Sequence, residues 1–374
     1  MLTAATVLVV QLPFRHATAW HWFDQAAHLL IGQGPGPHGL HLYAGHPEFQ
    51  FGPLSIVAAV PLAVTGALAA MATLSFVGVW CAVALTRLAG RLCPSADQRA
   101  TWVSTTAGGV LLILVWGDVA VRTTHLDDGI ALAATVAALA AAARGRGGLA
   151  AVAFGVAGAA KPWAVAFAPI LLALDDDRRW RHLALAFGIV ALTWAPFLLA
   201  EPETLRIGGH TITNESSSAL RALGVDTPAT PGWVRPTQLV GGVLVAAGLS
   251  IRGRWAGAVM AAVAVRLLFD PAANRYYTVG LVLGLLLHEL FTRPERLPWM
   301  AACAAVLLEV PQNPAFPPSV AGWLRVLVVV EVFVAAARAP LSPALPAREP
   351  VFSGLSTLAP HGGSLARRAA LHRR

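Results

Sequence analysis

Apolar runs of helical length recur along nearly the whole chain, and short polar segments rich in arginine and proline separate them. A helix needs about 20 apolar residues to cross a bilayer, and a run much shorter than this must tilt or lie partly behind its neighbours. The runs are 1–14, 67–90, 101–117, 129–143, 149–160, 163–174, 183–199, 236–251, 255–269, 276–291, 297–310 and 319–337. The pattern predicts an all-α polytopic membrane protein of about 12 transmembrane helices, with the shorter ones grouped around a cavity.

The composition supports this fold class. Hydrophobic residues make up 56% of the 374-residue chain and charged residues only 12%, and the mean hydropathy is +0.64. A soluble domain carries charge on about 25% of its residues. The net charge of +8 does not indicate a nucleic-acid partner, because the arginines follow the loops; we expect the lipid bilayer to be the surrounding partner.

The placement of arginine predicts the topology. Arginines cluster between the apolar runs at 87–99, 144–146, 178–181, 252–254, 293–296 and from 338 onward. Because cytoplasmic loops carry an excess of Lys and Arg, we expect these clusters and both termini in the cytoplasm of a multi-pass plasma-membrane protein. Residues 1–337 then form a single transmembrane domain, and 338–374 a disordered basic cytoplasmic tail.

The remaining loops lie on the opposite, outer face and hold most of the unusual polar residues. The first of them predicts an interfacial amphipathic helix over 20–30, rich in aromatic residues, and a second short apolar segment over 54–64 that cannot span a membrane. The polar residues gathered on this face are Asp24, His125, Asp127, Asp128, Lys161, Arg206, His210, Asp270, Asn274, Arg275 and Tyr276. This asymmetry predicts an active site at the outer face.

Lys161 is the only lysine among 27 basic residues, and it lies inside an apolar stretch. A cation there is costly unless it faces a counter-charge or a polar cavity, so we expect it to meet an anion. Depletion of lysine codons in a GC-rich genome is the alternative explanation. Asp127 and Asp128 are open to two interpretations as well, since acids at a helix start also serve as caps. The four histidines between His28 and His46 are too loosely spaced to predict a metal site, and we expect no bound cofactor; a divalent ion remains possible but has no ligand set.

Three stretches resemble the GT-C superfamily of integral-membrane glycosyltransferases, in particular the actinobacterial mannosyltransferases that use polyprenyl-phosphate-mannose. They are WFDQAAHLLIGQGP with Asp24, followed by Tyr43 and Phe51-Gly52-Pro53-Leu54; HLDDGIALAATVAALAAAARGR from His125; and GLAAVAFGVAGAAKPWAVAFAPILL around Lys161. They cover roughly residues 15–182, so residues 1–182 are a GT-C-like module and 183–337 supply additional helices. The chain departs from the family pattern at Leu126 and Gly52, where the family has proline.

The resemblance implies an inverting glycosyl transfer from a polyprenyl-phosphate sugar, most simply mannose, to an envelope glycolipid or polysaccharide. Asp24 is the expected general base. Lys161, Arg275 and Tyr276 are expected to bind the donor phosphate. His125, Asp127, Asp128 and His210 are expected to bind the sugar or the acceptor.

Two other functions fit the pattern. A transporter or flippase of lipid-linked sugars would have many spans, but the halves 1–182 and 183–374 show no internal repeat and the polar residues avoid the midplane. A non-catalytic subunit that binds lipid-linked sugars is compatible with every feature above.

Overall fold

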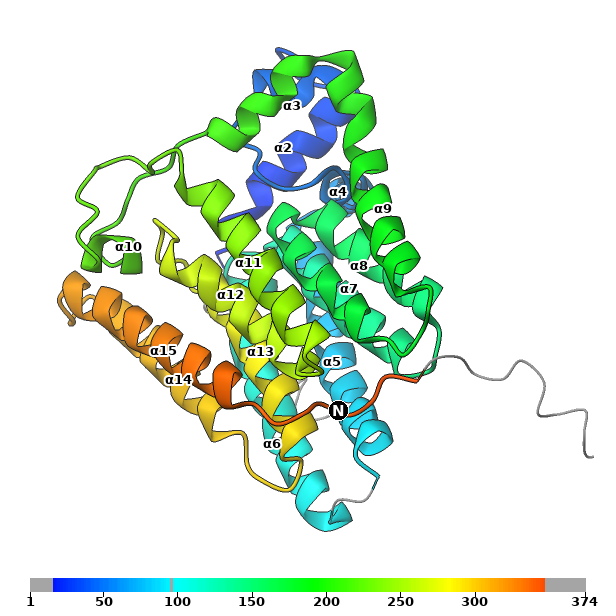
Figure 1. Ribbon diagram of the computed structural model, residues 1–374. Helices are drawn as coiled ribbons and strands as arrows, with labels where there is room; N and C mark the ends of the chain where they lie inside the picture. Colours follow the sequence, from blue (N-terminus) through cyan, green and yellow to red (C-terminus); the bar gives the residue numbers. More distant parts are fainter. Residues whose placement is uncertain (1–15, 95–96, 347–374) are drawn as a thin grey trace, which may run out of the picture.

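The computed structural model describes residues 16–94 and 97–346, and this part of the chain folds into helices without a named strand (Figure 1). The predicted first span, 1–14, and most of the predicted tail, from residue 347, lie outside the described residues. Arg338 ends the last described helix, so the predicted boundary of the helical domain at residue 337 falls beside an observed helix end.

Helices occupy the other predicted apolar runs. These are α5 (Ala67–Leu92), α6 (Gln98–Gly117), α7 (Leu126–Ala142), α8 (Gly147–Ala160), the 3₁₀ segment η4 (Pro162–Ala173), α9 (Arg179–Ala200), α11 (Val234–Ile251), η6 with α12 (Trp255–Gly257 and Ala258–Leu268), α13 (Tyr276–Thr292), α14 with η7 (Trp299–Glu309 and Val310–Gln312) and α15 (Pro318–Arg338). The sequence pattern therefore locates the helices well.

Five helices in the described part of the chain are long and apolar enough to cross a membrane. They are Ala67–Leu92, Gln98–Arg122, Arg179–Ala200, Val234–Ile251 and Pro318–Arg338. The other apolar helices have 10 to 17 residues. The protein is thus a helical membrane protein, while the predicted total of about 12 spans is not established.

The first polar loop folds into short helices that sit at one end of the bundle: α2 (Trp20–Leu30), η2 (Gly39–His41), α3 (Leu42–Gly45) and α4 (Pro53–Thr65). In Figure 1, α2 and α3 lie at the end opposite the loop that joins α13 to α14. Helix α2 is amphipathic as predicted: Phe23 and Leu29 are buried while Trp22 is largely exposed. The loop after α9 adds η5 (Pro202–Gly209) and the single turn α10 (Ala219–Ala222).

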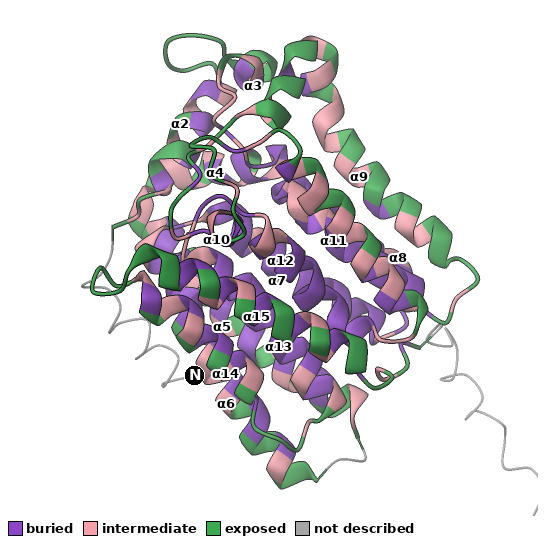
Figure 2. Ribbon diagram, turned by 60° about the vertical axis from the view of Figure 1, so that its left-hand side comes forward, coloured by how far each residue is buried: buried purple, intermediate pink, exposed green. Residues whose placement is uncertain are grey.

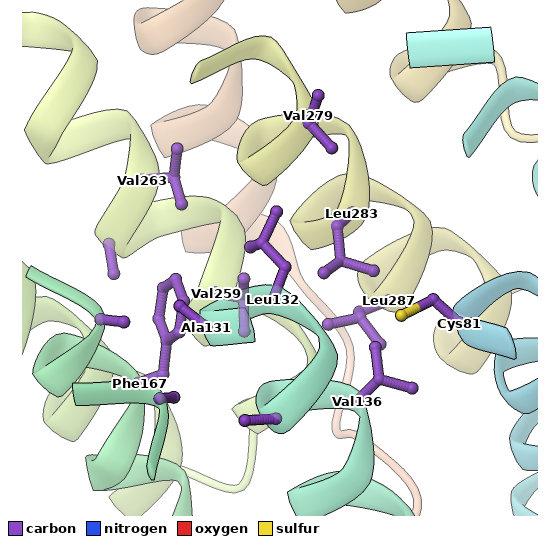
Figure 3. Packing of buried hydrophobic residues seen from close by; sticks show 14 of the residues in the cluster. Cys81, Ala131, Leu132, Val136, Phe167, Val259, Val263, Val279, Leu283 and Leu287 are labelled. Carbon is purple, nitrogen blue, oxygen red and sulfur yellow. The ribbon is translucent and has the colours of Figure 1, made fainter. Parts of the chain in front are cut away.

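The core lies where α7, η4, α12 and α13 meet. Figure 3 shows Leu132 and Val136 of α7 near Leu283 and Leu287 of α13, and all four are almost fully buried. Helix α13 is buried along nearly its whole length, whereas α9 exposes most of its surface (Figure 2). An exposed apolar helix of 22 residues is suited to contact with lipid.

Glycine allows one close approach that positions the site. The Gly52 N–H donates to the carbonyl of Ala160 at 2.8 Å, and a Cβ on Gly52 would lie 2.0 Å from the carbonyl oxygen of Ala159. The Ser55 hydroxyl donates to the same Ala160 carbonyl at 2.9 Å. The start of α4 therefore caps the end of α8, and glycine is required where the family pattern has proline.

Candidate functional site

A buried cluster of charged side chains joins the start of α7 to the end of α8. The Lys161 ammonium lies 2.5 Å from Asp127 Oδ2 and 2.9 Å from Asp128 Oδ2. His125 Nδ1 lies 2.5 Å from Asp127 Oδ1 and 2.9 Å from Asp128 Oδ2. The side chain of Lys161 is only 8% exposed, so its anion is supplied by the protein itself. The expectation that this lysine meets an anion holds for the described structure.

Local backbone geometry places these four groups. Thr124 has a positive φ of 54° and directs the chain from the π-helical turn η3 (Asp118–Arg122) into α7. Asp127 and Asp128 then fall in the first turn of α7, where the helix dipole favours negative charge. Lys161 is extended at the end of α8 and precedes Pro162, which cannot continue the α-helical hydrogen bonds.

Aromatic rings enclose the cluster. The rings of His125 and Tyr276 are 3.9 Å apart, and the Lys161 ammonium lies 5.8 Å from the Tyr276 ring centroid. Phe23 of α2 packs edge-on against His125 at 5.8 Å, and the Ala19 N–H donates to the Thr123 carbonyl. The interfacial helix α2 is therefore held directly against the loop that carries the cluster.

The charges of the cluster affect the pKa of His125, which lies just outside α7. Burial disfavours the imidazolium, but the carboxylates of Asp127 and Asp128 outweigh both burial and Lys161 and raise the pKa of His125 above its usual 6.5. We expect a charged imidazole to hold the two carboxylates together with Lys161.

A second group of residues, absent from the sequence-based site, lies beside the first. The Arg266 guanidinium stacks between Trp163 and Tyr277, 4.5 and 4.4 Å from their ring centroids, and forms an ion pair with Asp270 at 3.3 Å. Arg325 is 2% exposed, and its Nη1 has no hydrogen-bond partner among the described residues. Arg266 and Arg325 both interact with the Asp270 carboxylate, which joins them in one buried group.

Lone arginines inside apolar runs were the available sequence signal for this second group. Arg266 interrupts the run 255–269 and Arg325 the run 319–337. An ionisable residue within a membrane helix is a candidate functional residue by default. The sequence reasoning followed arginines in loops and passed over these two.

Arg275 belongs to a different group. Its Nε lies 3.9 Å from Glu309 Oε2, and its side chain is 38% exposed. Nearby, Asp118 and Arg122 form an ion pair at 2.8 Å within the π-helical turn. Arg275 is thus more accessible than Lys161 and less tightly paired.

Asp24 and His210 lie apart from the buried cluster. The Asp24 side chain is 40% exposed on α2, and His28, one turn later, approaches it at 3.8 Å. His210 follows η5 in the long polar loop. The structure brings together His125, Asp127, Asp128, Lys161 and Tyr276. Asp24, Arg275 and His210 are not part of this cluster.

The cluster also contains a set of possible metal ligands. Donor atoms of His125, Asp127 and Asp128 lie within 4.8 Å of one another. However, the Lys161 ammonium already contacts both carboxylates, and a divalent ion would have to displace it. The residues present fit an internal ion cluster better than a metal site.

Comparison with known proteins identifies the family. The family model of glycosyltransferase family 87 matches residues 49–288, which include the charged cluster, Arg266 with Asp270, and Arg275, but not Arg325. The chain belongs to this family. It is therefore a membrane glycosyltransferase of the GT-C type, as the sequence resemblance implied at the level of the superfamily. No curated protein and no solved structure matches the chain.

Proposed function

We propose that the protein transfers a sugar, with mannose as the first candidate, from a polyprenyl-phosphate donor to an envelope glycolipid or polysaccharide at the outer face of the plasma membrane. The family assignment supports glycosyl transfer. Asp24, a half-exposed carboxylate on a helix packed against the buried cluster, is the observation that carries the mechanism. A base must reach a substrate from solvent, and Asp127 and Asp128 cannot do so while they are buried and ion-paired.

The step is a single displacement with inversion. Asp24 accepts the proton of an acceptor hydroxyl, and the oxygen attacks the anomeric carbon of the donor sugar. The bond between that carbon and the phosphate oxygen breaks, and polyprenyl phosphate leaves with the electron pair. The leaving group is already ionised, so it needs cations rather than an acid.

Roles for the remaining residues follow from their exposure. Arg275, which is accessible and only loosely paired, is the first candidate for contact with the phosphate. The Tyr276 hydroxyl beside it donates to the Tyr277 hydroxyl at 3.3 Å and would turn from that partner to the phosphate. Lys161 adds positive charge from within the cluster. Asp127, Asp128 and His125 would fix Lys161 and shape the sugar pocket, and His210 would meet the acceptor.

The test measures transfer from polyprenyl-phosphate-mannose to a membrane-lipid extract in nanodiscs, with wild type and Asp24→Asn compared. General-base catalysis contributes about 10²–10⁴-fold, so the variant should lose at least that lower factor. Glu48→Gln, which alters another partly exposed carboxylate of the same loop, should stay within about twofold of wild type.

Equal transfer by wild type and Asp24→Asn would exclude Asp24 as the base. If neither wild type nor Asp24→Asn transfers mannose, the next measurement is binding of the donor lipid to wild type. Binding without transfer indicates a non-catalytic binding subunit or a missing acceptor. Lack of binding excludes this donor. Uptake or flipping of the lipid without transfer would instead indicate a transporter.

A further inference from the structure

A cavity unrelated to the charged cluster opens between α13, α14 and α15. Its volume is about 640 Å³, within the roughly 300–1,000 Å³ typical of sites for small ligands. Most of its lining is apolar, with Leu285 of α13, Ala304 and Leu307 of α14, and Leu327 and Val328 of α15. In Figure 1 these three helices lie on one side of the bundle, and the α13–α14 loop lies at the end away from α2 and α3.

One end of the cavity carries three arginines, Arg293, Arg296 and Arg338. All three side chains are exposed, and none forms an ion pair within residues 16–94 and 97–346. Two come from the loop between α13 and α14 and the third from the last turn of α15, and they meet at one mouth of the cavity. Trp299, 66% exposed, lies at the same mouth, where an indole ring is suited to the interface between lipid and water.

The acids of the cavity do not balance these arginines. Glu289 accepts the N–H groups of Met300 and Ala301 at 2.9 and 3.0 Å, which caps the start of α14, and it also interacts with Arg293, so it offsets part of one arginine's charge. Glu331 lies two turns before Arg338 on α15 and forms no ion pair in the described structure. The mouth therefore has an excess of positive charge, and the apolar body of the cavity begins directly behind it.

We propose that this cavity binds an anionic phospholipid, with its phosphate at Arg293, Arg296 and Arg338 and one acyl chain along the apolar body between α14 and α15. A charged mouth followed by an apolar body matches an amphiphile that the bilayer itself supplies. Each arginine near a membrane surface adds attraction for anionic headgroups. This site lies at the opposite end of the bundle from α2, so it is separate from the proposed transfer site.

The test is native mass spectrometry of the detergent-purified full chain titrated with phosphatidylglycerol or phosphatidylcholine. We expect wild type to retain phosphatidylglycerol selectively. Arg293→Gln/Arg296→Gln should weaken that binding about tenfold or more. Arg178→Gln/Arg179→Gln, which removes two exposed arginines at the start of α9, outside the cavity, should leave it unchanged.

Two further variants test the site within the cavity. Ala304→Phe fills the apolar body and should abolish retention of the lipid while the thermal unfolding midpoint shows that the protein remains folded. Glu331→Gln removes an opposing charge and should bind phosphatidylglycerol as tightly as wild type or more tightly. Weaker binding of phosphatidylglycerol by Glu331→Gln would overturn the proposed electrostatic attraction, because removing a negative charge beside the arginines cannot weaken their hold on an anionic headgroup.

Two results would overturn the proposal: an equal loss of phosphatidylglycerol binding in the two double-arginine variants, or equal retention of both lipids by wild type. Either result would mean that the lipid binds non-specifically at the protein surface.

Discussion

Replacing Lys161 with methionine tests whether the charged cluster holds the structure together. Methionine keeps much of the length of the side chain but removes the ammonium that lies 2.5 and 2.9 Å from Asp127 and Asp128. The side chains of these two aspartates are 1% and 3% exposed, so their charges would remain buried with His125 as the only directly contacting positive group and Arg266 acting from farther away.

The size of the effect follows from that burial. Breaking a buried ion pair by removing one partner costs about 3–5 kcal/mol, because the remaining charge is left uncompensated. At about 2 °C per kcal/mol for a large chain, the thermal unfolding midpoint should fall by roughly 6–10 °C. Lys161→Arg should also destabilise the protein, since a wide planar fork does not fit where a compact ammonium bridges two carboxylates.

Tryptophan fluorescence during heating of the detergent-purified protein measures the midpoint. Arg206→Met is the matched control: the Arg206 side chain is 69% exposed and pairs only with Glu203, and an exposed pair contributes about 0–1 kcal/mol. The double variant Lys161→Met/Asp128→Asn should recover part of the loss, because it leaves one buried charge fewer. A midpoint for Lys161→Met within about 1 °C of wild type would refute the reasoning.

Two more predictions concern the neighbours of the cluster. Gly52→Ala should lower the unfolding midpoint and the yield of folded protein, because its Cβ would lie 2.0 Å from the Ala159 carbonyl oxygen. Gly188→Ala is the control, because a Cβ at Gly188 meets open space and should lower neither quantity. Equal behaviour of the two variants would contradict the close approach at Gly52. Folding raises the pKa of His125 above its usual value of 6.5. The charged imidazole therefore contributes its full stabilisation below pH 6.5, and this stabilisation is lost as the pH rises through the pKa of the folded state. Midpoints measured from pH 6 to pH 9 should therefore fall more steeply for wild type than for His125→Asn, and parallel curves would contradict the charged imidazole.

The positions of the helices could be predicted from the sequence because each apolar run corresponds to one helical segment. Each predicted run in the described part of the chain has a helix in place, with ends shifted by a few residues. The number of spans could not be predicted, because runs such as 149–160 and 163–174 are long enough for helices and too short to settle a crossing. In the structure these two runs form α8 and η4, which are separated by a break at Lys161.

The partners of the site residues were only partly predictable. The position of Lys161 inside an apolar run predicted that it meets an anion, but 33 and 34 residues separate it from Asp128 and Asp127 in the chain. Only the packing of α7 against α8 brings them together. The sequence left Asp127 and Asp128 open between cap and function, and the structure shows them in the first helical turn and in the ion cluster at once.

The single lysine also allows the opening of the charged cluster to be followed by chemical labelling. Apart from the chain's α-amino group, the only primary amine is Lys161, and the fold buries it between two carboxylates. An amine-reactive reagent should therefore leave Lys161 unlabelled while the cluster is closed. The rate of any slow labelling at Lys161 would measure how often α7 and α8 separate, without an engineered probe.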